Sequence, residues 1–142
     1  MRANTPSVTV IGFGEAGLSL CIGWNRRGVR SFDIKQTNPD LKVAKCAEMH
    51  HRGVEAVEDP GAAVDGADLI FSTVTADQAF AAASSAAPWL KPGAFFFDLN
   101  SCAPSTKQKS AAVIEAAGGR YVDIAVMATI TPHYHHTPML IC

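Results

Sequence analysis

The stretch S-V-T-V-I-G-F-G-E-A-G, residues 7–17, predicts both a fold and a ligand. Residues 8–11 are β-branched and mostly apolar, which predicts a short buried strand. The pattern G-x-G-x-x-G follows at residues 12–17, and apolar positions after it predict a helix that ends by Gly28. A strand, a glycine turn and a helix in this order are typical of a dinucleotide-binding site.

Each glycine of the motif has a separate physical role. Gly12 permits the tight turn out of the strand, Gly14 lets a pyrophosphate approach the backbone, and Gly17 lets the helix pack closely. The first N–H groups of the helix and the positive end of its dipole then favour phosphate. The alternative is a glycine-rich turn without a ligand. We expect cofactor contacts from all six motif residues: Gly12, Phe13, Gly14, Glu15, Ala16 and Gly17.

A second strand, predicted at residues 29–34, carries an acidic residue where the adenosine ribose of a dinucleotide would lie. Asp33 comes 19 residues after Gly14, and one carboxylate can accept both ribose hydroxyls but repels a 2′-phosphate. Asp33 therefore favours NAD as the cofactor, whereas the nearby Lys35 leaves NADP possible. We expect Ile34 and Lys35 to contact the cofactor together with Asp33. The alternative is that Asp33 caps a turn.

The remaining pattern alternates strands with helices. A chain of 142 residues is one domain by length. The order predicts a Rossmann-type, doubly wound α/β fold: a mainly parallel sheet of about six strands with helices on both faces. Further strands are expected at 54–57, 67–75, 94–99 and 120–126. Helices are expected from about 39 to 53, at 76–90 and at 104–117, with an aspartate-capped turn or small helix at 59–66.

Polar residues end the fourth predicted strand. In such sheets, ligands bind beyond the carboxyl ends of the strands. We therefore expect Thr73, Val74 and Thr75 on the nicotinamide side of the site. An equal alternative is that these hydroxyls merely end the strand.

Composition narrows the function classes. Hydrophobic residues make up 48% and charged residues 18%, which is typical of globular domains. A net charge of -1 without a basic block argues against nucleic-acid binding. The sequence has no uninterrupted run of 18 apolar residues, so no membrane span is predicted. The four cysteines are far apart, which favours free thiols and a cytoplasmic location.

Residues 12–17 together with D-L-N-S-C-A-P at 98–104 resemble the 3-hydroxyacid dehydrogenase family, which includes 6-phosphogluconate and 3-hydroxyisobutyrate dehydrogenases. In that family, a strand-end D-x-(S/N)-(S/T)-x-x-P signature lies beside the substrate and the nicotinamide. The resemblance implies that Asn100 belongs to the cofactor site and that Ser101 is catalytic, holding the substrate hydroxyl or carboxylate. The alternative for Ser101 is a hydroxyl that caps the next helix.

The resemblance covers the N-terminal half of the family and implies NAD(P)-dependent oxidation of a CH–OH group in a hydroxyacid or sugar acid. A non-catalytic dinucleotide-binding module is the alternative. The family's catalytic lysine lies in a later helical domain, so we expect a longer, homodimeric protein and an inactive 142-residue chain. Met127–Thr129 stand where the family has a Ser-Gly-Gly turn, which predicts a different substrate.

Other conspicuous side chains receive weaker interpretations. We expect His133, His135 and His136 to lie on an unanchored tail, solvated or near the substrate, and no metal site is predicted. Lys107 and Lys109 are expected to project along a helix flank, away from the site. Cys102 has no recognisable partner base and is not expected to be a nucleophile.

Overall fold

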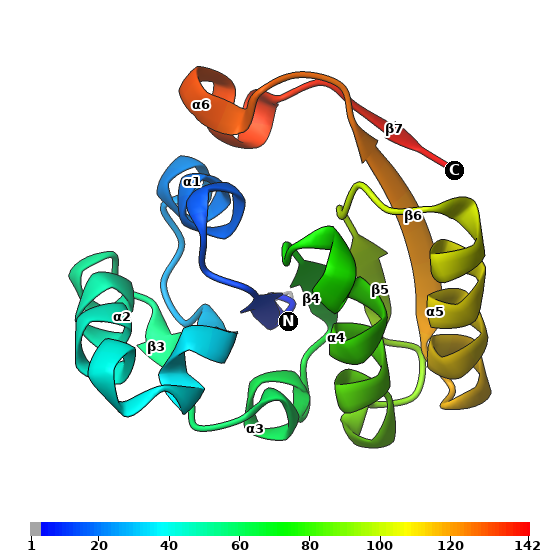
Figure 1. Ribbon diagram of the computed structural model, residues 1–142, viewed down its shortest axis with the longest axis horizontal. Helices are drawn as coiled ribbons and strands as arrows, with labels where there is room; N and C mark the ends of the chain where they lie inside the picture. The colour runs from blue at the N-terminus through cyan, green and yellow to red at the C-terminus, as the bar shows by residue number, and fades with distance from the viewer. Residues whose placement is uncertain (1–3) are drawn as a thin grey trace.

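Seven strands form one sheet in the order β3-β2-β1-β4-β5-β6-β7 in the computed structural model, which describes residues 4–142 (Figure 1). The strands are β1 Val8–Ile11, β2 Arg30–Phe32, β3 Glu55–Ala56, β4 Leu69–Ser72, β5 Phe95–Asp98, β6 Arg120–Val126 and β7 Met139–Ile141. The α-helices are α1 Glu15–Trp24, α2 Pro39–His51, α3 Pro60–Val64, α4 Ala79–Ala86, α5 Pro104–Ala116 and α6 Ile130–His133. The 3-10 helices are η1 Ile34–Thr37, η2 Ala76–Gln78, η3 Ala87–Trp89 and η4 Tyr134–His136.

The strand order reverses beside β1, and this reversal positions the site. β1 pairs in parallel with β2 on one side and with β4 on the other. Ile11 is level with Phe32 of β2 and with Ser72 of β4, so the three strands end at the same edge. The helices that follow β1 and β4 cover opposite faces of the sheet. A crevice between two such strand ends is where open α/β sheets bind ligands.

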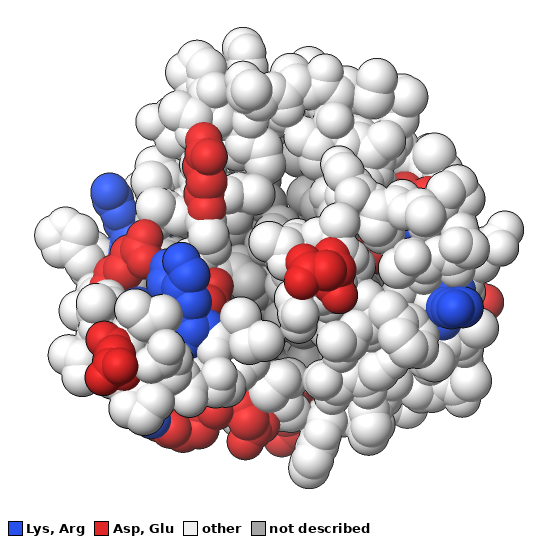
Figure 2. Space-filling view, in the orientation of Figure 1, with Lys and Arg blue, Asp and Glu red and all other residues white. Residues whose placement is uncertain are grey.

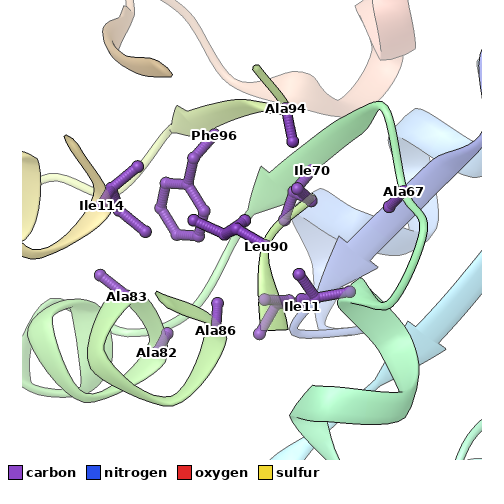
Figure 3. Close-up of a cluster of buried hydrophobic side chains, with 11 residues drawn as sticks. Ile11, Ala67, Ile70, Ala82, Ala83, Ala86, Leu90, Ala94, Phe96 and Ile114 are labelled. Atoms are coloured by element: carbon purple, nitrogen blue, oxygen red, sulfur yellow. The ribbon is translucent and has the colours of Figure 1, made fainter. Parts of the chain in front are cut away.

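Alternate residues of the strands pack against different layers. Ile11, Ile70 and Phe96 face α3, α4 and α5, and Figure 3 shows them meeting the small side chains of α4. Val8 and Val10 face the opposite way, towards α1 and α2. Each large aliphatic or aromatic side chain fully buried in this way contributes about 1.5–3 kcal/mol. The doubly wound α/β fold with helices on both faces is confirmed.

The sequence prediction missed the last strand. β7 is antiparallel to β6, pairing Val126 with Met139 and Ile124 with Ile141, so the sheet has seven strands rather than about six. Residues 127–138 separate the two strands, and the Met127 N–H donates to the Pro138 carbonyl at the point where they meet. This return is far longer than the two-residue turns that mark a hairpin in sequence.

The expectation of an unanchored tail is also wrong. The segment 130–136 packs on α1, where the hydroxyls of Ser19 and Thr131 lie 3.3 Å apart. Gly23 makes this contact possible, because a Cβ atom there would lie 2.2 Å from Nδ1 of His135. The tail therefore crosses back over the first helix before it enters β7.

Several element boundaries differ from those predicted. α1 ends at Trp24, because Asn25 adopts a left-handed conformation with φ of 45°. The predicted strand at 67–75 shortens to β4, and the predicted helix at 76–90 divides into η2, α4 and η3. The aspartate cap is confirmed: Asp59 accepts a hydrogen bond of 2.8 Å from the Ala62 N–H at the start of α3. Every helix within residues 4–142 is too short or too polar to cross a bilayer.

Candidate functional site

The three glycines that follow β1 differ in what surrounds them. Gly12 has φ of +92°, and a Cβ atom there would lie 2.3 Å from the Thr73 carbonyl oxygen. A Cβ atom on Gly17 would lie 2.2 Å from the Gly12 carbonyl oxygen. Gly14 has an ordinary φ of -84°, and a Cβ atom there would have no described atom within 4 Å. The fold thus explains the first and third glycines, whereas the second faces open space.

A cleft of about 440 Å³ opens beside Gly14, between the ends of β1 and β4. It is lined by ten of the residues predicted to bind a cofactor: Gly12, Gly14, Glu15, Ala16, Asp33, Ile34, Lys35, Thr73, Val74 and Thr75. Figure 2 shows a hollow at the centre of this face, where the basic side chains are scattered and lie near acidic ones. Phosphate recognition here would therefore rely on backbone N–H groups and the dipole of α1.

Asp33 caps a turn and also lines the cleft. One carboxylate oxygen accepts the Lys35 N–H at 2.9 Å and so caps η1, while the other accepts the Phe13 N–H at 2.7 Å. Gln36 completes the cap by accepting the Asp33 N–H at 2.8 Å. The turn-capping interpretation is therefore correct. The carboxylate also lines the cleft, and each of its oxygens keeps a lone pair for a further donor.

The side chain of Phe13 does not enter the cleft, so the predicted contact between this side chain and a cofactor is wrong. Its ring is fully buried among Val10, Cys21 and Met49. Its backbone bonds within the protein at both ends: the N–H donates to Asp33, and the carbonyl accepts from Nζ of Lys45 at 2.9 Å. Sequence reasoning missed Lys45, because a lysine within a helix normally indicates an exposed position.

The residues after β4 hold the glycine turn as well as lining the cleft. The Thr73 hydroxyl donates to the Gly12 carbonyl at 2.8 Å, so the strand-end interpretation applies to this hydroxyl. The Val74 N–H donates to Oδ1 of Asn100 at 2.8 Å, which ties the end of β4 to the segment after β5. Val74 and Thr75 remain on the cleft side of this connection.

Asn100 and Ser101 are adjacent but differ in environment. Asn100 is buried, and its amide donates to the Ser72 hydroxyl at 3.0 Å, so its side chain faces the protein. Ser101 is exposed, and within residues 4–142 no hydrogen bond involves its hydroxyl. The helix-cap alternative for Ser101 is wrong, because the N-cap of α5 is Ala103.

A buried ion-pair network lies at the end of β5, three residues before Ser101 in the sequence. Asp98 is fully buried and accepts the Tyr121 hydroxyl at 2.7 Å and the Asn100 N–H at 2.9 Å. Nζ of Lys107 lies 3.4 Å from Asp98 Oδ1 and 2.7 Å from Asp123 Oδ1. The expectation that Lys107 projects away along the helix flank is therefore wrong, because two carboxylates attract it to the strand ends. Burial, and then the bond to Asp98, raises the pKa of Tyr121 well above its ordinary value.

Two other candidate groups are not built for catalysis. Partial burial, followed by the charge of Asp98, raises the pKa of the Cys102 thiol, so the nucleophilic thiolate is disfavoured. His135 lies against Gly23 and Trp24 at the far end of α1, remote from the glycine turn. The described part of the chain has no group of three metal-ligating side chains.

The strand order, the glycine turn and the cleft define a Rossmann-type dinucleotide-binding domain. Residues 7–131 match the family described as the NAD binding domain of 6-phosphogluconate dehydrogenase. The chain belongs to this family of NAD-binding domains. No protein of curated function matches the sequence significantly.

Solved structures share this fold and extend well beyond it. A conserved hypothetical protein from Sinorhizobium meliloti is 33% identical with a TM-score of 0.91, over 99% of this chain and 48% of that one. 3-Hydroxyisobutyrate dehydrogenase from Mycobacterium tuberculosis, solved with L-serine, is 18% identical with a TM-score of 0.74, over 89% and 42%. An imine reductase from Myxococcus stipitatus, solved with NADP⁺, is 22% identical with a TM-score of 0.70, over 87% and 42%. The chain spans about half the length of these structures.

Proposed function

We propose that this chain is the cofactor-binding part of an NAD-preferring oxidoreductase that acts on a CH–OH group of a hydroxyacid or sugar acid. The observation that carries the proposal is the cleft at the β1–β4 edge. It combines an open Gly14, the Asp33 carboxylate and the end of β4, where Val74 is bonded to Asn100, the residue before the exposed Ser101.

Cofactor preference follows from the charge at the end of β2. Asp33 lines the cleft with its carboxylate already fixed by two backbone N–H groups, so it cannot swing aside to admit another anion. Two ribose hydroxyls can donate to it, whereas a 2′-phosphate would meet its negative charge. Lys35 offsets this repulsion only in part, because its exposed ammonium remains hydrated.

The nicotinamide, when bound, supplies the hydride acceptor. The protein must then orient the carbinol carbon and remove the hydroxyl proton. Ser101 is suited to orientation, because its hydroxyl is exposed and has no partner within residues 4–142. Lys107 is a poor base, since two carboxylates and the Asp98 carbonyl hold its ammonium group. We expect the base and the homodimer contacts in a helical domain of a longer protein, since this chain spans about half the length of the structures that it matches.

Substrate and location follow from weaker features. Met127–Thr129 occupy the segment after β6, and the large, exposed side chain of Met127 favours a substrate with an apolar portion. All four cysteines are free, which is consistent with a cytoplasmic protein. The alternative is a dinucleotide-binding module without catalysis, for which the buried amide of Asn100, bonded to Ser72, provides the motive.

The first test is calorimetric titration of the 142-residue chain with NAD⁺, NADH, NADP⁺ and NADPH. We expect binding of all four, tighter for NAD(H), and no turnover with 3-hydroxyacids or sugar acids. The longer gene product, assayed for NADH formation with the same compounds, should show activity. Absence of any dinucleotide binding would refute the proposal, and binding without activity in the longer product would favour the non-catalytic module.

The role of Ser101 is tested in the longer product. Ser101→Ala should lower kcat at least tenfold while the affinity for NAD⁺ stays the same, because the hydroxyl orients the substrate rather than the cofactor. Ser105→Ala is the matched control, since Ser105 is also an exposed serine but lies in the first turn of α5 rather than directly after Asn100. Equal activity of the Ser101 variant and the control would remove Ser101 from the mechanism.

A further inference from the structure

We propose that Lys45 of α2 is a positioning residue for the turn that receives the pyrophosphate. Its ammonium group holds the carbonyl of Phe13 and thereby fixes the orientation of the Phe13–Gly14 peptide. The inference rests on the proposed function in one respect, because it assumes that a dinucleotide occupies the cleft.

The first observation is the burial of a side chain that could have reached solvent. Lys45 is only 8% exposed, and Nζ donates to the Phe13 carbonyl at 2.9 Å and to Glu48 Oε2 at 2.6 Å. A lysine on the surface of a helix normally extends its ammonium into water. Here the side chain turns inward, and a buried ammonium is tolerated only where hydrogen bonds replace its hydration.

The second observation is that the ring, the N–H and the carbonyl of Phe13 are all held by other residues. Its ring is fully buried, its N–H donates to Oδ2 of Asp33 at 2.7 Å, and its carbonyl accepts from Lys45. Asp33 and Lys45 come from different elements, the end of β2 and the middle of α2. The residue between the first two glycines of the motif is thus clamped from two sides.

The clamp matters because Gly14 is conformationally free. In a trans peptide the C=O and the following N–H point to opposite edges, so fixing the Phe13 carbonyl directs the Gly14 N–H away from Lys45. Within residues 4–142 no hydrogen bond uses that N–H, and Gly14 lines the cleft. Without Lys45 the Phe13–Gly14 peptide could rotate, since glycine tolerates most backbone conformations. The donors at the start of α1 would then need to be reordered when phosphate binds.

The test compares Lys45→Met and Lys45→Arg with Lys42→Met in the 142-residue chain. Lys42 lies on the same helix in an exposed ion pair with Glu58, so its substitution removes the same charge without touching the turn. ADP-ribose probes the pyrophosphate site by calorimetry, and adenosine probes the ribose site by NMR titration. Thermal unfolding monitors the fold. If Lys45→Met does not fold, Lys45→Gln, which keeps a polar end, is compared in the same way.

We expect Lys45→Met to weaken ADP-ribose binding about tenfold, the scale of one charge-assisted hydrogen bond, and adenosine binding by less than about twofold. Lys45→Arg should restore most of the loss, and Lys42→Met should bind as the wild type does. The ratio of the ADP-ribose dissociation constants of Lys45→Met and the wild type should stay the same from about 50 mM to about 500 mM salt. Salt screens a charge attraction but not a change of backbone geometry.

Three results would overturn the inference. They are an unchanged affinity of Lys45→Met for ADP-ribose, an equal loss for adenosine, and a ratio that vanishes at high salt, which would indicate simple charge attraction. Failure of the proposed function is distinguishable, because the wild-type chain itself would then not bind ADP-ribose.

Discussion

Gly14 is the residue at which ligand binding and folding can be separated most cleanly. The perturbation is Gly14→Val. In the unliganded protein the first carbon of the new side chain has no described atom within 4 Å, and φ of -84° suits any L-residue. The variant loses less chain entropy on folding, which stabilises it. Valine is a poorer N-cap than glycine, which destabilises it. These two effects oppose each other, so the free energy of unfolding should change by less than about 1 kcal/mol.

Binding should respond very differently. Valine at this position fills the space through which a pyrophosphate reaches the backbone N–H groups of α1. Each hydrogen bond to a charged group contributes about 1.5–3 kcal/mol, so the loss of two such bonds weakens binding by about 10²–10⁴-fold. Calorimetric titration with NADH measures the affinity, and thermal unfolding measures the stability of the same sample.

Gly17→Ala provides the contrasting variant. Its new Cβ atom would lie 2.2 Å from the Gly12 carbonyl oxygen, so the helix must shift. Overpacking of this kind costs about 1–3 kcal/mol, and both stability and binding should fall. A folded Gly14→Val variant that binds NADH as tightly as the wild type would refute the assignment of Gly14 to the pyrophosphate site.

Further predictions concern charge and thiol chemistry. Asp33→Ser should narrow the difference in binding free energy between NAD⁺ and NADP⁺ by about 1–2 kcal/mol, and an unchanged difference in parallel titrations would contradict the ribose role. Lys107→Met leaves the buried Asp98 without its cation and should lower the free energy of unfolding by about 3 kcal/mol. Unfolding in urea measures this change, and a decrease below about 0.5 kcal/mol would show that the ion pair is dispensable. Burial raises the pKa of Cys21 to about 12, so the folded state favours its protonated thiol and loses this stabilisation as the pH rises from 9 towards 12. At pH 8, iodoacetamide should therefore modify the exposed Cys142 long before Cys21, and equal rates by mass spectrometry would contradict the burial of Cys21.

Local patterns were sufficient for the parts of the site that depend on backbone conformation. The turn after β1 follows from Gly12 and Gly17, since only glycine fits where a Cβ would lie within 2.3 Å of a carbonyl oxygen. The placement of Asp33 and Thr73 at one edge follows from parallel strands that begin and end in register. The residue types and their spacing predict these features, although the close approach at Gly12 is to the carbonyl of Thr73, which is far away in the sequence.

Side-chain direction was less predictable, because it depends on what comes from elsewhere in the fold. Lys45 and Lys107 both lie within helices and both turn inward, one to the Phe13 carbonyl and the other to Asp98 and Asp123. Asn100 fits the expected signature, yet its amide binds Ser72 and the backbone of Val74. A sequence pattern gives the spacing of polar groups but not the partners that attract them.

The amino-acid sequence by itself determined the doubly wound α/β fold and the glycine turn, because strand–turn–helix periodicity and glycine stereochemistry are local properties. The tertiary structure decided which groups face the cleft. It directed the Phe13 ring into the core, carried residues 130–136 back across α1 into β7, and surrounded the glycine turn with Asp33, Thr73 and Lys45. The hydrogen bonds of Asp33, Thr73 and Lys45 to the glycine turn join residues at least 20 positions apart, so only the packed fold brings these donors and acceptors within reach of one another.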